Sequence, residues 1–252
     1  MAFPTAPAGY RPSIELLQGK TILVTGAGDG IGRAAALAYA GHGATVILLG
    51  RTGSKLERVY DEIEATGLPK PALVELDLAA AEEENYANLA AGLAGEFGHL
   101  DGLLHNASIL GERRPIESAG YPAWLEVMQV NLNAQFLLTR QLLPLLRAAP
   151  AASIIFTSSG VGRTGKAYWG AYAVSKFATE GFMQVLADEL ENTSRVRVNS
   201  LNPGPTNTAM RRSAYPGEKP TDNPAPEDIM ATYLYLMGDD STGITGRAFN
   251  AR

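Results

Sequence analysis

The amino-acid sequence predicts a single-domain α/β fold, with helices on both faces of a doubly wound, seven-stranded parallel sheet. Short, nearly continuous apolar segments alternate with amphipathic segments of helical length, and the first apolar segment leads directly into a glycine-rich turn. No change of composition along the 252 residues marks a second domain. Apolar strands separated by helices are typical of parallel sheets covered on both faces, and right-handed crossovers give the doubly wound arrangement.

The expected strands are short, and the expected helices lie between them. Strands are expected at residues 21–25, 44–49, 72–76, 101–105, 153–157, 195–201 and 247–250. Helices are expected at residues 31–41, 54–66, 82–97, 124–147 and 171–191. Pro226 is suited to the first turn of a further helix, and Gly238 is suited to end it. In such a sheet, ligands gather beyond the carboxyl ends of the strands.

Composition excludes several function classes. The net charge of −5 does not favour nucleic acid as a partner. The chain has no cysteine and its three histidines lack metal-ligand spacing, so neither disulfides nor a metal site are expected. No apolar run is long enough to span a bilayer, and residues 1–12 lack the apolar core of a signal peptide. We therefore expect a cytoplasmic enzyme with no membrane partner.

Two segments are expected to differ from the rest of the chain. Residues 1–17 are expected to form an N-terminal arm on a single dinucleotide-binding and catalytic domain, residues 18–252. Residues 204–226 are rich in proline and are expected to form a long loop without regular structure. Long loops in compact domains are commonly functional, so a lid over the substrate is the favoured interpretation. A surface loop without a role is the alternative.

Tyr172 and Lys176 form the strongest signal for chemistry. They lie four residues apart in a predicted helix, so their side chains share one face. A free phenol titrates near roughly 10, and a fixed neighbouring cation lowers its pKa. A phenol activated in this way exchanges a proton with a carbonyl or alcohol oxygen near neutral pH. Taken alone, most Tyr and Lys pairs at this spacing are ordinary exposed pairs on a helix.

The glycine-rich turn supplies the second half of such a reaction. Residues 25–32 follow a predicted strand and begin a predicted helix, where bare backbone amides bind a pyrophosphate. Gly26, Gly30 and Gly32 allow a tight turn, close approach of phosphate and packing of helix on strand, as in Rossmann-type sites. A nucleotide that carries hydride makes the protein a carbonyl–alcohol oxidoreductase. A glycine turn without a ligand is the alternative.

The choice between NADP(H) and NAD(H) is expected at the end of the second strand. An acidic residue there binds the adenosine ribose of NAD(H) and repels a 2′-phosphate. Gly50 stands at that position and Arg51 follows, whose planar guanidinium suits a phosphate; Ser54 and Lys55 are placed to add contacts. We therefore predict NADP(H). NAD(H) is the alternative, in which Arg51 is a solvated loop cation.

Several separated motifs together give the chain a family resemblance. Over residues 18–249 it resembles the compact branch of the short-chain dehydrogenase/reductase family, and within it a small bacterial subgroup of YciK type. The glycine turn has the family's spacing, Asn131 and Ser159 lie at the family's separations from Tyr172, and residues 105–108 resemble its Asn-Asn-Ala-Gly element. The resemblance implies these cofactor contacts: Gly26, Gly28, Gly30, Ile31, Gly32, Arg51, Asp77, Leu78, Asn106, Ala107, Tyr172, Lys176, Pro203, Gly204, Thr206 and Thr208.

The resemblance also assigns roles to a catalytic tetrad of Asn131, Ser159, Tyr172 and Lys176. Tyr172 would donate or accept the proton, and Ser159 would hydrogen-bond the substrate oxygen. Lys176 would bind the nicotinamide ribose and lower the pKa of the phenol, while Asn131 would help to hold a water that relays protons. His105 departs from the family pattern, which has asparagine at this position.

The leading functional hypothesis is an NADP(H)-dependent oxidoreductase that interconverts a carbonyl compound and a secondary alcohol. A 3-oxoacyl thioester, with an acyl carrier protein as partner, is one candidate substrate. An NAD-linked alcohol dehydrogenase and a catalytically silent nucleotide-binding protein are the alternatives. The basic pairs at residues 113–114 and 211–212 would receive an anionic group, or are solvated surface charge. The apolar surface of the helices at 124–147 and 171–191 predicts a homodimer or homotetramer, as the resemblance also implies.

Overall fold

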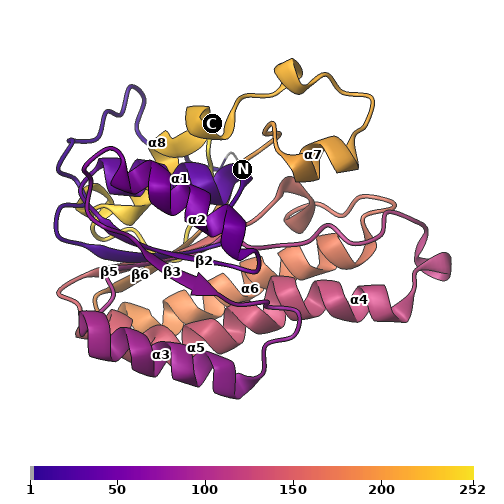
Figure 1. Ribbon diagram of the computed structural model, residues 1–252. Coiled ribbons are helices and arrows are strands. Elements are labelled where there is room, and N and C mark those ends of the chain that lie inside the picture. Colours follow the sequence, from indigo (N-terminus) through magenta and orange to yellow (C-terminus); the bar gives the residue numbers. More distant parts are fainter. Residues whose placement is uncertain (1–2) are drawn as a thin grey trace.

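The computed structural model describes residues 3–252 and contains one parallel sheet with helices packed on both faces (Figure 1). The strand order is β3-β2-β1-β4-β5-β6-β7. The strands are β1 (Thr21–Thr25), β2 (Thr45–Gly50), β3 (Ala72–Glu75), β4 (Gly102–His105), β5 (Ala152–Thr157), β6 (Val196–Asn202) and β7 (Ala248–Asn250). All seven predicted strands are present, and the predicted fold class is confirmed.

The helices also follow the predicted order. They are α1 (Gly30–Gly41), α2 (Gly53–Glu64), α3 (Glu83–Phe97), α4 (Tyr121–Met128), α5 (Ala134–Ala148), α6 (Gly170–Glu191), α7 (Ala209–Ala214) and α8 (Met230–Met237). Short 3₁₀ turns are η1 (Ile116–Ser118), η3 (Gly160–Gly162), η4 (Pro220–Asp222), η5 (Pro226–Ile229) and η6 (Asp239–Ser241). Pro226 begins a turn that leads into α8, and Gly238 follows the last residue of that helix, as predicted.

The helix expected at residues 124–147 is divided. Its two parts, α4 and α5, are joined by a π-helical turn, η2 (Gln129–Asn133). Such wide turns place one extra residue in the helix and are often found at functional sites. Here the turn contains Asn131, whose side chain is fully buried. The amphipathic pattern predicts a helix but cannot reveal the extra residue within it.

Each face of the sheet carries its own apolar core. Helices α1, α2 and α8 cover one face, and α3, α5 and α6 cover the other (Figure 1). Along β1 the side chains alternate between the two cores, with Ile22 and Val24 in the first and Leu23 in the second. Because both faces are buried, the central strands β1, β2 and β4 have runs of consecutive apolar residues rather than apolar residues at every second position.

The strand order places a ligand crevice at the middle of the sheet. β1 pairs with β2 on one side and with β4 on the other. The chain therefore builds the sheet outward from β1 to β3 in one direction, and from β4 to β7 in the opposite direction. The connections that follow β1 and β4 therefore diverge at their carboxyl ends. An open α/β sheet binds its ligands at such a point.

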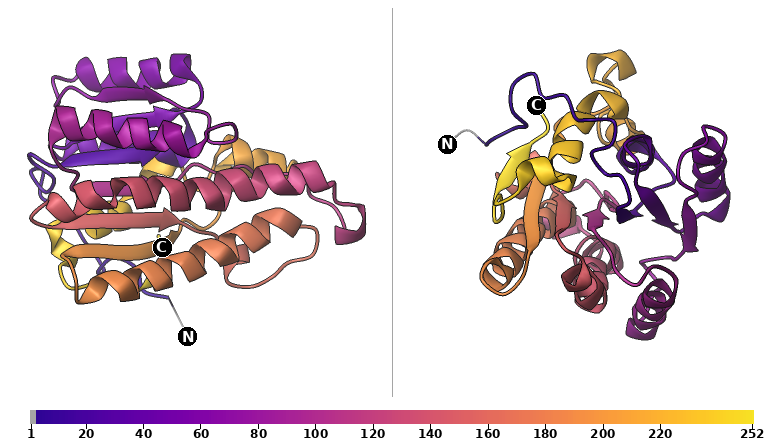
Figure 2. Two further views of the ribbon diagram at one scale, coloured as in Figure 1. Left: turned by 90° about the horizontal axis from the view of Figure 1, so that it is seen from below. Right: turned by 90° about the vertical axis from the view of Figure 1, so that its left-hand side faces the viewer.

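The described part of the N-terminal arm lies against the body of the domain. The backbone N–H of Asn250 donates to the carbonyl of Pro4 (2.8 Å), and that of Leu17 donates to His42 (2.9 Å). Tyr10 packs edge-on against Tyr235 of α8, with ring centroids 5.2 Å apart. The right-hand view of Figure 2 shows this segment beside the C-terminal strand. Residues 1–2 of the predicted arm lie outside the described residues.

The segment at 204–226 contains regular structure, contrary to expectation. It forms α7 and the turn η4, and it extends beyond the sheet in Figure 1. The hydroxyl of Thr208 accepts a hydrogen bond from the backbone N–H of Arg211 (3.1 Å), which caps the start of α7. The guanidinium of Arg211 then binds Glu218, which closes the turn after the helix. These local polar contacts order a segment whose proline content suggested a bare loop.

Within residues 3–252 no helix is long and apolar enough to cross a membrane.

We predict that the protein self-associates through α4–α5 and α6. Phe136 and Phe177 expose 47% and 45% of their surface on these helices, and Leu125 of α4 and Val174 and Val185 of α6 are exposed as well. Replacing Phe136 and Phe177 with Glu should convert a dimer or tetramer into smaller species in sedimentation. Ile14→Glu is the control, because Ile14 is 71% exposed on the N-terminal arm. A parent protein that sediments as a monomer at micromolar concentration would contradict the prediction.

Candidate active site

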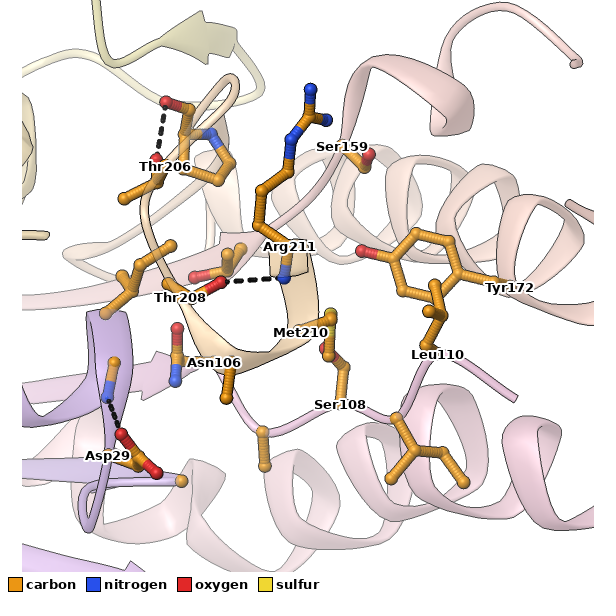
Figure 3. A pocket seen from close by; sticks show the side chains of 18 of the residues that line it. Asp29, Asn106, Ser108, Leu110, Ser159, Tyr172, Thr206, Thr208, Met210 and Arg211 are labelled. Carbon is orange, nitrogen blue, oxygen red and sulfur yellow. Dashed lines mark hydrogen bonds between the residues drawn. The ribbon is translucent and has the colours of Figure 1, made fainter. Parts of the chain in front are cut away.

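A cavity of about 740 Å³ opens beyond the carboxyl ends of the central strands (Figure 3). Its walls come from the loops after β1 to β6, together with the N-terminal parts of α1, α2 and α6, the π turn η2 and helix α7. These segments are far apart in the sequence, and the crevice between β1 and β4 brings them together. The residues predicted to bind the nucleotide and those predicted to be catalytic can therefore meet in this cavity.

Most predicted site residues line this cavity. They are Gly26, Gly28, Gly30, Ile31, Arg51, Asp77, Leu78, Asn106, Ala107, Ser159, Tyr172, Lys176, Pro203, Gly204, Thr206 and Thr208. Gly32 and Asn131 do not line it. Both lie behind its wall and contact residues that form the wall. Their predicted roles as a cofactor contact and a proton-relay residue are therefore at most indirect in this geometry.

The glycine turn packs tightly against the loop after β4. Gly26 has φ +67°, which favours glycine, and a Cβ there would lie 3.0 Å from the Cα of Ala107. A Cβ at Gly32 would collide with the carbonyl oxygen of Gly26. The Thr25 hydroxyl accepts hydrogen bonds from the backbone N–H groups of Asn106 (2.9 Å) and Ala107 (3.0 Å). The turn and the neighbouring loop are thus held as one surface.

The adenosine end of the crevice carries a charged pair and a separate arginine. The Lys55 ammonium lies 2.6 Å from a carboxylate oxygen of Asp29. This hydrogen bond is the main reason that the pKa of Asp29 is lowered. Arg51 is exposed at the cavity, and within residues 3–252 no carboxylate pairs with it. Of the two cations, Arg51 is the one left available to a ligand.

Asn131 joins the cavity wall to helix α6. Its side-chain carbonyl accepts from the backbone N–H of Ile109 (2.8 Å), and its amide donates to the Ile109 carbonyl (3.0 Å). The same amide group donates to the Ser175 hydroxyl (3.1 Å), which in turn donates to the carbonyl of Tyr172 (2.8 Å). The π turn therefore positions Asn131 to fix the loop after β4 relative to the turn that bears Tyr172.

Lys176 is a buried cation. It is 1% exposed, and its ammonium donates to the carbonyl of Thr157 at the end of β5 (2.8 Å). Burial lowers the pKa of Lys176 to about 8, while Glu180, one turn further along α6, raises it. A charge so poorly solvated is typical of functional sites.

Tyr172 differs from the sequence prediction in its electrostatics. Its side chain is 8% exposed at the cavity wall, and burial raises the pKa of the phenol to about 12. The Ser159 side chain acts in the opposite direction. The predicted lowering of the Tyr172 pKa by Lys176 is therefore not present in this structure. The ammonium lies 5.7 Å from the centre of the phenol ring and is bound to the Thr157 carbonyl, so desolvation dominates.

A buried ion pair joins α6 to the segment that follows β5. The guanidinium of Arg163 donates to Glu180 (2.8 Å), to the side chain of Asn250 (2.9 Å) and to the carbonyl of Phe249 (2.9 Å). The hydroxyl of Ser200 donates to the other carboxylate oxygen of Glu180 (2.6 Å). These contacts tie α6 to β6 and β7. Motif spacing gives no indication of this network, because its members are spread from residue 163 to residue 250.

His105 is a core residue. Its imidazole stacks on Phe156, with ring centroids 4.7 Å apart, and contacts the Thr139 hydroxyl at 2.8 Å. Burial lowers the pKa of His105 to about 3, with a smaller contribution from Lys176. The departure from the family's asparagine thus changes packing beneath the site rather than the cavity surface.

Sequence reasoning missed several residues of the site. Thr25 and Ser175 hold the walls together, and the Thr157 carbonyl holds Lys176. The hydroxyl groups could have been suspected because they adjoin the predicted glycine turn and tetrad. The Thr157 carbonyl carries no side-chain signal, so only the folded structure identifies it.

The chain is similar in sequence to known proteins. The family model described as short chain dehydrogenase matches residues 20–219. The chain belongs to the short-chain dehydrogenase family. It is 54% identical over 243 residues to the oxidoreductase YciK of Escherichia coli strain K12, covering 96% of each chain. The predicted resemblance to the family and to YciK-type members is confirmed, and the chain is an oxidoreductase of this family.

Solved structures agree with the fold. A short-chain dehydrogenase from Pseudomonas syringae superposes with a TM-score of 0.95 at 60% identity, covering 96% of this chain and 98% of the other. A short-chain dehydrogenase from Escherichia coli CFT073, complexed with NADPH, superposes with a TM-score of 0.93 at 54% identity. That alignment covers 96% of this chain and all of the other.

We predict that Asn131→Ala destabilises the fold by about 2–4 kcal/mol, because it removes three buried hydrogen bonds and leaves the partners unsatisfied. Urea unfolding measures the change. Asn133→Ala is the matched control in the same π turn, since Asn133 is exposed, and it should change stability by less than about 0.5 kcal/mol. Equal losses in the two variants would contradict a wall-fixing role for Asn131.

Proposed function

We propose that the protein is an NADP(H)-dependent oxidoreductase that interconverts a carbonyl compound and a secondary alcohol. The observation that carries this proposal is the convergence of Tyr172, Ser159 and Lys176 on the same cavity as the glycine turn. A proton-transferring phenol and a nucleotide crevice in one space are what hydride transfer to a carbonyl requires. The nucleotide would lie against Gly26, Gly30 and Arg51, and the nicotinamide end would lie near Thr206 and Thr208.

The residues of the crevice fit NADP(H). A Cβ at Gly26 or Gly32 would collide with neighbouring protein atoms, so these glycines allow the tight turn and close helix–strand packing that a Rossmann-type nucleotide site requires. Gly50 leaves the end of β2 without the carboxylate that would repel a 2′-phosphate, and Arg51 beside it has no acidic partner among the described residues. The NADPH complex of the E. coli CFT073 relative supports the same choice.

The chemistry of the cavity follows from its side chains. The bound nicotinamide supplies or accepts hydride. In the reductive direction the Tyr172 phenol donates its proton to the carbonyl oxygen, and the Ser159 hydroxyl hydrogen-bonds the same oxygen as negative charge develops on it. The Lys176 ammonium, 5.7 Å from the centre of the phenol ring, would attract the phenolate once it has formed, although burial dominates the pKa of Tyr172 beforehand. In the oxidative direction the phenolate takes the proton back from the alcohol.

The substrate is proposed only as a class. The cavity wall around Tyr172 is formed by Leu110, Trp169 and Met210, which suits an aliphatic or alicyclic ketone. A 3-oxoacyl thioester delivered by an acyl carrier protein is a second candidate. An NAD-linked dehydrogenase and a protein that binds nucleotide without turnover are the alternative functions, and the first two experiments below distinguish them.

Tyr172→Phe should abolish most turnover, by about a hundredfold or more, because it removes the proton donor and keeps the ring. Binding of NADPH, followed by fluorescence, should change by less than about threefold, since the phenol hydroxyl contributes little of the nucleotide's contact. Tyr168→Phe is the control, because the exposed Tyr168 lies outside the cavity lining. A Tyr172→Phe enzyme that retains its turnover would refute the assignment.

Arg51→Ala should weaken NADPH binding about ten- to a hundredfold while changing NADH binding little, because only NADPH carries the 2′-phosphate. Titration calorimetry with both nucleotides measures the difference. Arg58→Ala serves as control, since Arg58 is a neighbouring surface arginine of α2 that does not line the cavity. A parent protein that binds both nucleotides equally would favour the NAD-linked alternative.

The reductive rate should fall as the pH rises above about 8. Lys176 has its pKa lowered to about 8, so its positive charge is present below that pH and lost above it. Tyr172, with its pKa near 12, stays protonated throughout this range. The pH profile of kcat/KM tests this. In Lys176→Arg the fall in kcat/KM at high pH should disappear, because a guanidinium keeps its positive charge. A parent profile that stays flat to pH 10 would exclude the role given to Lys176.

A further inference from the structure

Three cations surround the ring of Tyr215 at the cavity: Lys166 and Arg211 line the cavity, and Arg113 is an exposed residue that lies over two of the lining rings. The guanidinium of Arg113 lies 5.1 Å from the ring centre of Tyr215, and that of Arg211 lies 3.8 Å from it. The Lys166 ammonium lies 5.5 Å from the same ring and donates a hydrogen bond to its hydroxyl (3.0 Å). These residues come from the loop before α4, the loop before α6 and the lid helix α7 with the residue that follows it.

Only one of these cations is neutralised. Arg211 binds Glu218, whereas no described carboxylate pairs with Arg113 or Lys166. The arginines next to Arg113 and Arg211 in the sequence are also engaged, since Arg114 pairs with Glu112 (3.2 Å) and Arg212 donates to Asn207 (2.9 Å). Like charges held close together repel one another, and a bound anion would relieve that repulsion.

An unsatisfied buried donor lies at the same place. Trp169 lines the cavity and is 7% exposed, and its indole N–H is buried without a hydrogen-bond partner in the described structure. Arg113 stacks over the Trp169 ring at 4.8 Å. A buried N–H without an acceptor costs stability, so a small movement of the ring that brought this N–H to an acceptor oxygen of a ligand would be favourable.

The space between this cluster and Tyr172 is apolar. Trp169 separates the two, with its ring centre 5.7 Å from that of Tyr172 and 5.9 Å from that of Tyr215. Leu110 and Met210 pack in the same apolar cluster, and both stand close to Tyr172 in Figure 3. A ligand that reaches from the phenol to the cations must therefore carry an apolar spacer several bonds long.

We propose that Arg113, Lys166 and Trp169 bind an anionic group, a carboxylate or a phosphate, at the end of the substrate distant from its carbonyl. This inference rests on the proposed function and narrows its substrate class to ketones with an apolar spacer and a terminal anion. It places the anion site at Arg113 and Lys166 rather than at the paired residues Arg211 and Arg212. A docking site for a carrier protein fits less well, because Arg114 and Arg211 already hold their own acidic partners.

The test uses the whole protein with NADPH and two matched series of methyl ketones, from 4-oxopentanoate to 8-oxononanoate and their neutral terminal amides. Ketones with a terminal phosphate form a third arm, and the better of the two anions identifies the group. We expect kcat/KM to be at least about tenfold higher for the anionic ketone than for its amide, with an optimum at one chain length. Added salt should reduce that advantage.

Substitutions test which side chains bind the terminal anion of the substrate. Arg113→Gln with Lys166→Gln should raise KM for the anionic ketone about tenfold or more and leave the neutral amide within about twofold. Trp169→Phe should show a smaller selective loss, because it removes the N–H and keeps the ring. Arg114→Gln is the matched control and should change neither series. In a Trp124→Phe background, the remaining tryptophan should also report binding of the anionic ketone through its fluorescence, without turnover.

The outcomes separate this inference from the proposed function. If neutral and anionic ketones react equally and the double variant slows both alike, the anion site is refuted while the reductase function stands. If carrier-bound thioesters alone are turned over, the site is refuted in favour of protein docking. If NADPH binds but no ketone of either series is reduced, and neither anion changes the fluorescence, the proposed function and the substrate class fall together.

Discussion

The site depends on a pair of buried charges on one helix. Lys176 and Glu180 lie one turn apart on α6, and neither has solvent to stabilise it. The Lys176 ammonium is held by the carbonyl of Thr157, and Glu180 by Arg163 and Ser200. A buried charge that loses its partner is strongly destabilising, so α6 has little freedom to slide along the sheet. Because Tyr172 lies on the same helix, its phenol is held in a fixed position as well.

The opposite wall of the cavity is fixed by hydrogen bonds and close packing. Thr25 binds the loop after β4 to the glycine turn, and Asn131 binds the same loop to α6 through Ile109 and Ser175. Gly26 lets the two backbones approach more closely than any side chain would permit. The glycine turn and helix α6 are therefore held in a fixed relative position, which the proposed hydride transfer requires if reacting atoms are to be positioned.

The segment at 204–226 is ordered by different means and is held by weaker contacts than the core. Its helix α7 is short, and it is held by one capping hydroxyl and by the pairing of Arg211 with Glu218. Tyr215, at the end of this helix, contacts Trp169 and Lys166 on the far wall. These are partly exposed polar and aromatic contacts, and such contacts are weaker than the packing of the core. Motion at the site is expected here rather than in α6.

The sequence by itself determined the sheet, because an apolar run that recurs between amphipathic helices allows little else. It also located the glycine turn and the residues of the cavity wall, since motif spacing survives folding. It could not decide the pKa of Tyr172, because the i, i+4 spacing places the lysine nearby without showing that its ammonium binds the Thr157 carbonyl and that burial dominates. Nor could it show which cations remain unpaired, because the partners of Arg211, Arg212 and Arg114 depend on turns that only the folded chain forms. Spacing along a chain specifies which groups can meet, whereas solvation and pairing are properties of the assembled interior.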